Sequence, residues 1–213
     1  GERVPAYIEL PGTAQPSPLK LNTVLRMAAA ITLLLGISFL LKVVVFDTEQ
    51  LTVTGSGRNP GDPVQLADGS LVYLNKNSEI TFSKRFGRKN RALSLKGEAF
   101  FEVKRNEHIP FVVSTYKTTT RVLGTTFNIY SDGTGQVKVS VASGRVEFSA
   151  PEQHATVKLA AGENGLFSPS REGIQKESNT DPNFLAWKTG VLTFSNTPLS
   201  EAFLLLQRQY AHV

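Results

Sequence analysis

Residues 91–95 (RALSL) and 98–103 (EAFFEV) are two short runs that decide the fold class of this 213-residue chain. Apolar and polar residues alternate in the first run, as is typical of a strand with one face in a core. The second run is rich in phenylalanine, which favours strands. Gly97 stands between the runs, where it indicates a bulge or a close approach of two backbones. Both runs are therefore predicted to be β-strands.

Seven further runs of the same kind flank these two. They are 70–74 (SLVYL), 79–83 (EITFS), 111–114 (FVVS), 119–123 (TTRVL), 126–130 (TFNIY), 137–141 (VKVSV) and 145–149 (RVEFS). Asp68-Gly69, Asp132-Gly133 and Ser143-Gly144 supply turns, because glycine adopts the positive φ that tight turns need. The pattern predicts a mainly β chain, folded as a sandwich, a barrel or a solenoid-like stack.

A different pattern occupies residues 27–41 (MAAAITLLLGISFLL), which carry no charge. Beyond Lys42, residues 43–46 extend this stretch to about 20 residues, the length of a helix that crosses a bilayer. We therefore expect one transmembrane helix over residues 24–46. The alternatives are a signal peptide, although no A-x-A-like cleavage site follows, and a buried helix of a globular domain.

Charges on either side of this stretch indicate its orientation. Lys20 and Arg26 precede it, Asp47 and Glu49 follow it, and only Lys42 argues the other way. Basic residues near a span tend to stay in the cytoplasm. We therefore expect a single pass through a bacterial inner membrane, with the N-terminus cytoplasmic and the bulk of the chain periplasmic. The chain has no cysteine, so no disulfide is available to the outer part.

Changes in composition divide the chain into six expected segments. These are a cytoplasmic connector (1–23), the spanning helix (24–46), a linker (47–63), the all-β domain (64–170), a second linker (171–189) and a small α+β unit (190–213). The sequence starts with Gly1 and ends just after a helical pattern. We therefore expect truncation, with most of a cytoplasmic N-terminal region missing.

The small C-terminal unit is expected to begin with a strand over residues 191–194 (VLTF). Thr197 can cap a following helix, and Pro198 suits its first position. Apolar residues recur at helical spacing on one face, and they are Leu199, Ala202, Phe203, Leu206 and Tyr210. The strand is a candidate partner-binding edge, since an exposed strand can accept a partner strand; its residues are Val191, Leu192, Thr193 and Phe194. The alternative is an amphipathic helix that folds back on the β-domain.

No pattern of catalytic or metal-binding residues emerges. His108, His154 and His212 lack a second ligand at metal-binding spacing, and neither a nucleophile motif nor a phosphate-binding loop occurs. Glu98 and Glu102 would share one face of a strand, and as a carboxylate pair they suggest glycoside hydrolysis only weakly. We expect no enzyme activity, no metal and no cofactor.

Basic residues gather around Phe86-Gly87. They are Lys84, Arg85, Arg88, Lys89 and Arg91. We expect a solvated hairpin tip, and the alternative is a contact with anionic lipid headgroups or an acidic partner.

Six segments in succession resemble the periplasmic domain of FecR-type sigma regulators. They are LADGSLVYLNKNSEITFS (66–83), RALSLKGEAFFEV (91–103), PFVVST (110–115), VLGTTFNIY (122–130), VKVSVASGRVEF (137–148) and LAAGENGLFS (159–168). The positions carried over, which mostly build the fold in such proteins, are Asp68, Gly69, Ser70, Gly97, Glu98, Phe101, Pro110, Phe111, Gly124, Thr125 and Phe127. Residues 192–213 resemble the opening β-α unit of the secretin and TonB short N-terminal domain.

The resemblance implies a role in signalling across the membrane. In such systems an outer-membrane TonB-dependent transporter binds a nutrient, such as an iron chelate or a glycan, and exposes a periplasmic signalling domain. The regulator receives that domain outside and holds an extracytoplasmic-function sigma factor in the cytoplasm. The implied partners are therefore the sigma factor, the signalling domain and the membrane, with no direct contact to nucleic acid. The alternative is a membrane-tethered β-domain that binds a glycan or cell-wall polymer.

Overall fold

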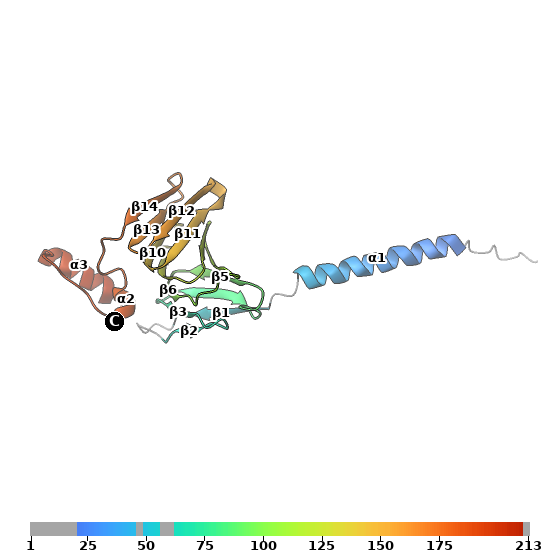
Figure 1. The fold of residues 1–213 in the computed structure, drawn as a ribbon, viewed down its shortest axis with the longest axis horizontal. Coiled ribbons are helices and arrows are strands. Elements are labelled where there is room, and N and C mark those ends of the chain that lie inside the picture. The colour runs from blue at the N-terminus through green and yellow to red at the C-terminus, as the bar shows by residue number, and fades with distance from the viewer. Residues whose placement is uncertain (1–20, 46–48, 56–61, 211–213) are drawn as a thin grey trace, which may run out of the picture. The chain divides into compact units, whose positions relative to one another are not determined.

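The computed structural model describes residues 21–45, 49–55 and 62–210, and the side chains of residues 25–38, 49–55 and 62–207. Most of the predicted connector and the last three residues lie outside the described residues. The chain divides into two compact units, Gly1–Asp47 and Thr48–Val213. The first contains helix α1, and the second contains all the strands together with α2 and α3 (Figure 1).

Helix α1 spans Leu21–Val45 and confirms a helix in the predicted region. All its described side chains are exposed, among them Leu33, Leu34 and Leu35 at 65–66 %. Within the described part of the chain, no helix is both long enough and apolar enough to span a membrane. The span over residues 24–46 therefore stays a prediction.

The second unit is built on two seven-stranded sheets. Sheet A has the order β1 (Gln50–Thr54), β4 (Glu79–Ser83), β5 (Arg91–Lys96), β7 (Phe111–Thr115), β8 (Thr118–Val122), β11 (Arg145–Ala150), β12 (Ala155–Ala160). Sheet B has the order β14 (Ile174–Ser178), β13 (Glu163–Phe167), β10 (Val137–Ser143), β9 (Thr126–Ser131), β6 (Glu98–Glu102), β3 (Leu71–Leu74), β2 (Val64–Gln65). Neighbouring strands are antiparallel except β5 and β7, which run parallel.

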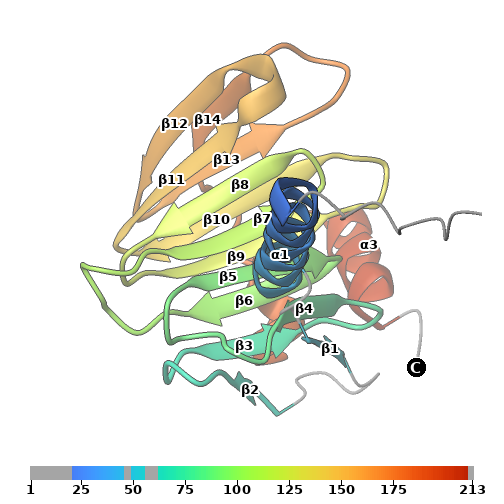
Figure 2. The same ribbon diagram turned by 90° about the vertical axis from the view of Figure 1, so that its right-hand side faces the viewer.

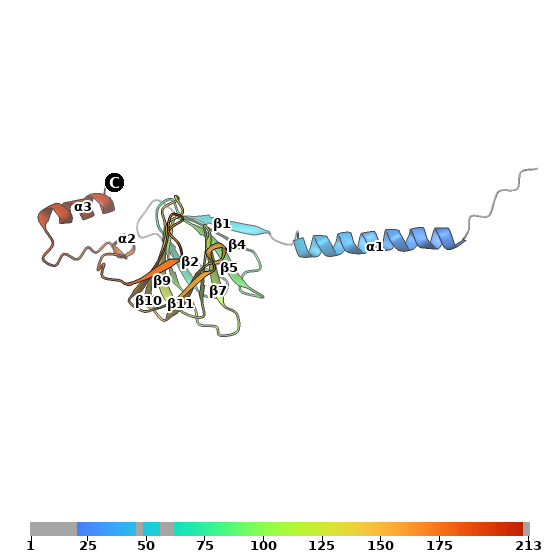
Figure 3. The same cartoon turned by 90° about the horizontal axis from the view of Figure 1, so that it is seen from above.

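The two sheets form the layers of a sandwich. Figure 2 shows β12 and β14 together at the top and β1 and β2 together at the bottom, and Figure 3 shows β9 and β10 in one layer and β5 and β7 in the other. One core of buried residues from both sheets fills the space between them. Of the three β folds that the sequence left open, the structure is therefore the sandwich.

Phenylalanine rings form the centre of this core. Phe101 of β6 and Phe127 of β9 stack with centroids 5.0 Å apart. Phe111 of β7 meets Phe101 edge-on at 6.1 Å, and Phe86 meets Phe111 at 5.7 Å. Since β6 belongs to sheet B and β7 to sheet A, the Phe101–Phe111 contact joins the two layers. Aromatic pairs of this kind add about 0.5–1.5 kcal/mol beyond their buried area.

All nine predicted β-runs are strands, β3 to β11, with ends within two residues of the predicted ones. Five strands were not predicted: β1, β2, β12, β13 and β14. The predicted linker 47–63 contains β1, and the predicted linker 171–189 contains β14 and α2. Strand β14 (IQKES) is exposed along most of its length and has one apolar residue, so it lacks the alternation that marks a half-buried strand.

After β14 the chain forms α2 (Ala186–Thr189) and α3 (Leu199–Tyr210). The predicted helix after Pro198 is confirmed. The predicted strand over residues 191–194 is wrong, because these residues are in no strand. The described part of the C-terminal unit is consequently helical, and not α+β as expected.

Gly97 links β5 to β6 in a conformation that excludes a side chain. Its φ is +85°, and a Cβ at this position would lie 2.5 Å from Ser78 Oγ and 2.9 Å from Ser78 Cα. The expected close approach of backbones is therefore found here. Gly133 offers a matched comparison, since its φ is +78° and nothing lies within 4 Å of a Cβ built on it.

We expect Gly133→Ala to lower the free energy of unfolding by about 1–2 kcal/mol, the cost of a left-handed backbone for a residue with a Cβ. Gly97→Ala should lower it by about 3 kcal/mol or more, because overpacking against Ser78 adds to that cost. Urea unfolding followed by circular dichroism measures both variants. Equal losses for the two variants would show that Ser78 moves aside without cost.

Candidate functional site

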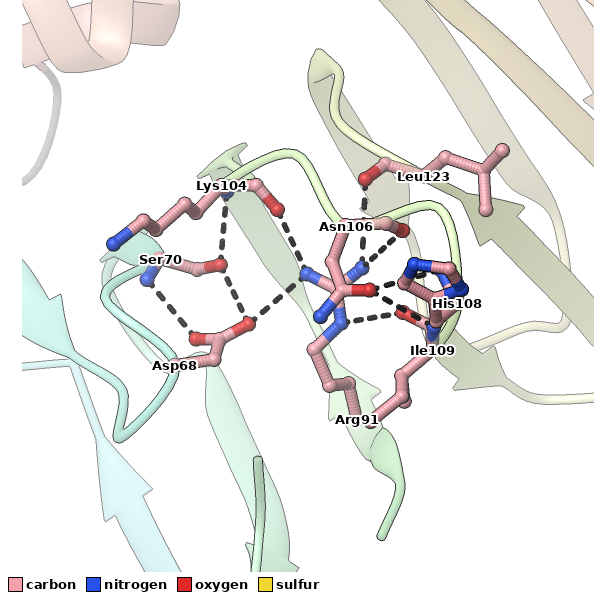
Figure 4. Close-up of polar contacts among 8 residues, drawn as sticks. All are labelled: Asp68, Ser70, Arg91, Lys104, Asn106, His108, Ile109 and Leu123. Atoms are coloured by element: carbon pink, nitrogen blue, oxygen red, sulfur yellow. Dashed lines mark hydrogen bonds and ion pairs between the residues drawn. The ribbon is translucent and has the colours of Figure 1, made fainter. Parts of the chain in front are cut away.

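The side chain of Arg91 lies at the centre of a buried polar network (Figure 4). Its guanidinium is 1 % exposed and contacts Asp68 Oδ2 at 3.2 Å through Nη1. It also donates to backbone carbonyls, at distances of 2.7–3.4 Å, of Ile109, Lys104, Asn106 and Leu123. One side chain thus holds together strand β5, the turn before β3, the β6–β7 connection and the end of β8.

Asp68, Gly69 and Ser70 form the tight turn that presents the carboxylate to Arg91. Asp68 Oδ1 accepts from the backbone N–H of Ser70 at 3.0 Å, and Asp68 Oδ2 accepts from the Ser70 hydroxyl at 2.9 Å. Gly69 has a φ of +82°. The Ser70 hydroxyl accepts in turn from the backbone N–H of Lys104 at 3.1 Å. Each member of the turn therefore has a structural role.

Arg91 corrects the prediction of a solvated basic cluster. It faces the interior, whereas Lys84, Arg85, Arg88 and Lys89 are exposed as expected. Lys84 forms an ion pair with Glu49 at 2.7 Å. The hairpin tip therefore carries four basic residues.

The other expected signature residues also lie in structural positions. A Cβ on Gly124 would lie 2.6 Å from Arg105 Cα, and Thr125 donates from its hydroxyl to the carbonyl of Arg145 at 2.9 Å. Phe101, Phe111 and Phe127 form the aromatic centre described above, and Pro110 lies half-buried just before β7. These residues shape the β-domain and do not converge on a site for chemistry.

Glu98 and Glu102 share the outer face of β6 but have different partners. Glu98 accepts from the side-chain amides of Asn75 at 2.7 Å and Asn128 at 2.8 Å. Glu102 Oε1 lies 3.3 Å from Lys188 Nζ. Both carboxylates are therefore engaged as structural acceptors. Among the described residues, no three His, Asp or Glu side chains come together as a metal site would require.

The segment after β14 docks on the outer face of sheet B. We call residues 181–194 the C-terminal segment. Ala186 and Trp187 are 5 % and 7 % exposed. Lys188 Nζ lies 4.0 Å from the ring centroid of Tyr73 and 4.4 Å from that of Phe100, both on the outer face of sheet B. This cation–π contact, together with the pair to Glu102, fastens α2 to the sheet.

The expected partner-binding edge, Val191 to Phe194, is held by a side chain. Asn183 Nδ2 donates to the carbonyl of Thr193 at 2.9 Å, and the N–H of Thr193 donates to Asn183 Oδ1 at 2.7 Å. The side-chain amide of Asn183 thus forms hydrogen bonds with both the N–H and the C=O of Thr193, as the backbone of a partner strand would. These residues therefore run beside Asn183 and form no edge of a sheet in the described structure.

Apolar side chains are exposed along this part of the chain. Val191 is 63 % exposed and Phe194 43 %, and in α3 the exposed fractions are 87 % for Leu199, 59 % for Phe203 and 63 % for Leu204. Exposed apolar residues that gather in one region mark interaction surfaces in soluble domains. The region from Val191 to Leu204 is therefore the best candidate for a partner contact in the second unit.

Comparison with known proteins identifies the fold family. The FecR protein family matches residues 56–147. Two crystal structures of a candidate anti-sigma factor from Parabacteroides distasonis ATCC 8503, at 2.50 Å and 1.65 Å resolution, are similar to the chain with a TM-score of 0.60 and 30 % identity. Each alignment covers 76 % of this chain and 75 % of the other. The chain belongs to the FecR family of anti-sigma factors. No curated protein matches it.

Membership of the FecR family makes this protein a regulator of a sigma factor. Sequence reasoning did not predict the roles of three residues that organise the site: Arg91, Asn183 and Lys188. The sequence did contain a signal for Arg91. In a strand, alternate residues point to the same face, so Arg91 faces the core together with Leu93 and Leu95. Asn183 and Lys188 had no such signal, since their partners lie far from any local pattern.

We expect Arg91→Met to lower the free energy of unfolding by about 3–5 kcal/mol, because it leaves the buried Asp68 carboxylate without its cationic partner. The matched control is Lys84→Met, which breaks an exposed pair (side chains 51 % and 77 % exposed) and should cost about 1 kcal/mol or less. Urea unfolding measures both. Arg91→Lys should remain strongly destabilised, since an ammonium cannot reproduce the fork of donors. A loss for Arg91→Met as small as for Lys84→Met would contradict this role.

Proposed function

We propose that this FecR-family protein is a single-pass protein of the bacterial inner membrane that regulates an extracytoplasmic-function sigma factor. In this proposal it responds to a TonB-dependent transporter of the outer membrane. The observation that carries the proposal is the FecR match of the β-domain, which follows the uncharged stretch of residues 27–41 in the sequence. The protein acts by binding its partners, without catalysis and without a cofactor, and the sigma factor binds on the N-terminal side of α1.

The apolar character of α1 supports the membrane anchor. Residues 27–41 carry no charge, and the exposed side chains of Leu33, Leu34 and Leu35 would lose contact with water in a bilayer. Removing apolar surface from water is favourable by about 25 cal/mol per Å². Lys20 and Arg26 before this stretch favour a cytoplasmic N-terminus.

The exposed apolar residues of the C-terminal region support the transporter contact. Val191 and Phe194 lie close in sequence to the docked Trp187, and Leu199 and Phe203 lie on α3. A folded signalling domain that covered them would bury apolar surface now in contact with water. The N–H and C=O of Thr193 are already hydrogen-bonded to the side chain of Asn183. We therefore assign the contact with the signalling domain to side chains and not to an added strand.

The chain has no cysteine, so single cysteines can report its topology. We expect Ser195→Cys, at an exposed position, to react with a membrane-impermeant maleimide in cells whose outer membrane alone is permeabilised. The control Thr13→Cys should react only after the inner membrane is dissolved. The opposite pattern would overturn the orientation, and reaction of both variants in whole cells would overturn the anchor.

A photo-crosslinking residue at Phe194 tests the transporter contact. We expect it to capture the N-terminal signalling domain of a TonB-dependent transporter in living cells, identified by mass spectrometry. The control places the same residue at Tyr116, which is 58 % exposed on the β7–β8 turn and should capture none of it. Equal capture at both positions, or capture at Tyr116 alone, would contradict a contact centred on the C-terminal region.

A further inference from the structure

Basic side chains gather at one end of the sandwich, on the loop between β4 and β5 (residues 84–90) and the loop between β6 and β7 (residues 103–110). We call these two loops the basic end. Its basic residues are Lys84, Arg85, Arg88, Lys89, Lys104 and Arg105, and all of them are exposed. The two loops carry one acidic residue, Glu107. The basic end therefore has a large excess of positive charge.

Buried contacts hold the two loops of the basic end side by side (Figure 4). Arg91 follows the first loop and donates to backbone carbonyls of the second. The turn at Asp68-Gly69 contacts both loops. A Cβ on Gly87 would lie 3.3 Å from the backbone nitrogen of Asp68, and a Cβ on Gly69 would lie 3.3 Å from Lys104 Cδ. The charges of both loops therefore belong to one surface.

The first loop is held in a defined shape by its own contacts. Phe86 is 2 % exposed, and its ring meets that of Phe111 at 5.7 Å. The backbone N–H of Phe86 donates to the carbonyl of Ser83 at 2.9 Å, and that of Gly87 donates to the carbonyl of Asn90 at 2.8 Å. A loop that is already ordered loses less conformational entropy on binding than a mobile one.

Acidic side chains neutralise few of the charges at the basic end. Lys84 and Arg105 each have a carboxylate partner, at 2.7 Å and 2.6 Å. Among the residues that the structure describes, no acidic side chain forms an ion pair with Arg88, Lys89 or Lys104. These three cations are therefore available to an anionic partner.

The opposite end of sheet A has no such excess of unpaired cations. Lys96 lies 3.3 Å from Glu79, and Lys117 lies 2.5 Å from Glu152. The length of β5 separates the two ends by about 17 Å, at about 3.3 Å per residue. This separation is about twice the Debye length of about 8 Å at physiological ionic strength. An anionic surface at the basic end therefore has little effect on the opposite end.

The basic end is also close, along the chain, to the predicted membrane span. The backbone N–H of Lys84 donates to the carbonyl of Glu49 at 2.9 Å. Glu49 is four residues beyond Val45, the last residue of α1, and a stretch of this length reaches about 14 Å at most. If residues 24–46 cross a bilayer, the surface of that bilayer is within reach of the basic end.

We infer that the basic end binds the phosphate groups of anionic lipids at the surface of the membrane. Guanidinium groups can form two parallel hydrogen bonds with phosphate oxygens, and clusters of basic residues next to a span bind anionic headgroups. A lipid is favoured over an acidic protein because the anchor supplies lipid at a high effective concentration. The inference rests on the membrane anchor proposed above and is independent of the transporter relay.

A fluorescent probe at the basic end tests this contact in the full chain, which has no native cysteine. Asn90→Cys, at an exposed position, is labelled with bimane. The chain is then reconstituted into vesicles of phosphatidylcholine, with or without an equal amount of phosphatidylglycerol, and both contain some phosphatidylcholine with a nitroxide on its headgroup. We expect the nitroxide to quench the probe strongly with phosphatidylglycerol and weakly without it. About 1 M salt should remove this difference, because the Debye length falls to about 3 Å.

A probe at Tyr116→Cys, on the β7–β8 turn at the opposite end of sheet A, is the control for position. It should be quenched weakly in both kinds of vesicle. Equal quenching at Asn90→Cys with and without phosphatidylglycerol overturns the inference. Equal quenching of the two probes with phosphatidylglycerol also overturns it, because the contact would then not be specific to the basic end.

Charge variants of the Asn90→Cys chain locate the contact. We expect Arg88→Gln and Lys89→Gln together to lower the ratio of quenched to unquenched probe, about fivefold for each charge removed. The matched control, Lys96→Gln with Lys117→Gln, removes the same charge at the opposite end and should leave the ratio unchanged. Equal losses in the two double variants would show an effect of net charge alone and overturn the inference.

Flotation of the same vesicles separates a failure of this inference from a failure of the anchor. A chain inserted through α1 floats with both kinds of vesicle, at low and at high salt. A chain that floats in this way and shows no quenching at Asn90→Cys overturns the lipid contact and leaves the anchor intact. A chain that does not float at high salt overturns the anchor, and the inference fails with it.

Discussion

The β-domain depends on the burial of one guanidinium group, that of Arg91. The chain between β6 and β7 and the turn after β8 are irregular, and their carbonyls lack partners from a sheet ladder. Buried carbonyls need hydrogen-bond donors, and Arg91 supplies them to residues 104, 106 and 109. The carbonyl of Leu123 accepts from the backbone N–H of Asn106 at 2.7 Å and from Arg91 at 3.4 Å. A buried ion pair alone rarely repays its desolvation. The carbonyls, more than Asp68, therefore explain why an arginine occupies this position.

The strands were predicted correctly where apolar and polar residues alternate clearly in the sequence, and they were predicted poorly at the edges of the two sheets. Strands β3 to β11 have core residues on one face, whereas β1 and β14 are mostly exposed. The same rule of alternation places Arg91 in phase with Leu93 and Leu95, but charge suggested a surface position. The charge of Arg91 thus led to a wrong prediction, whereas its position in the alternating pattern of the strand gives the correct one.

The candidate site was less accessible to prediction because it is made by contacts distant in sequence. Lys188 meets Glu102, and the two residues are 86 positions apart. The β-like sequence VLTF suggested a strand at 191–194, but a strand needs a partner backbone, and here the amide of Asn183 takes that place. Local propensity describes what a segment favours, and tertiary contacts decide what it forms.

The C-terminal segment is held by one large buried side chain, Trp187, which contributes roughly 3 kcal/mol, and by two weaker polar contacts. A cation–π contact contributes about 0.5–2 kcal/mol, and a partly exposed ion pair such as Lys188–Glu102, whose carboxylate side chain is 39 % exposed, contributes about 1 kcal/mol or less. The core instead buries many large apolar side chains, each worth about 1.5–3 kcal/mol. Segments of low local stability open without global unfolding. Binding at the exposed apolar residues at the end of this segment and on α3 can therefore shift the segment on sheet B while the sandwich and the Arg91 network stay intact.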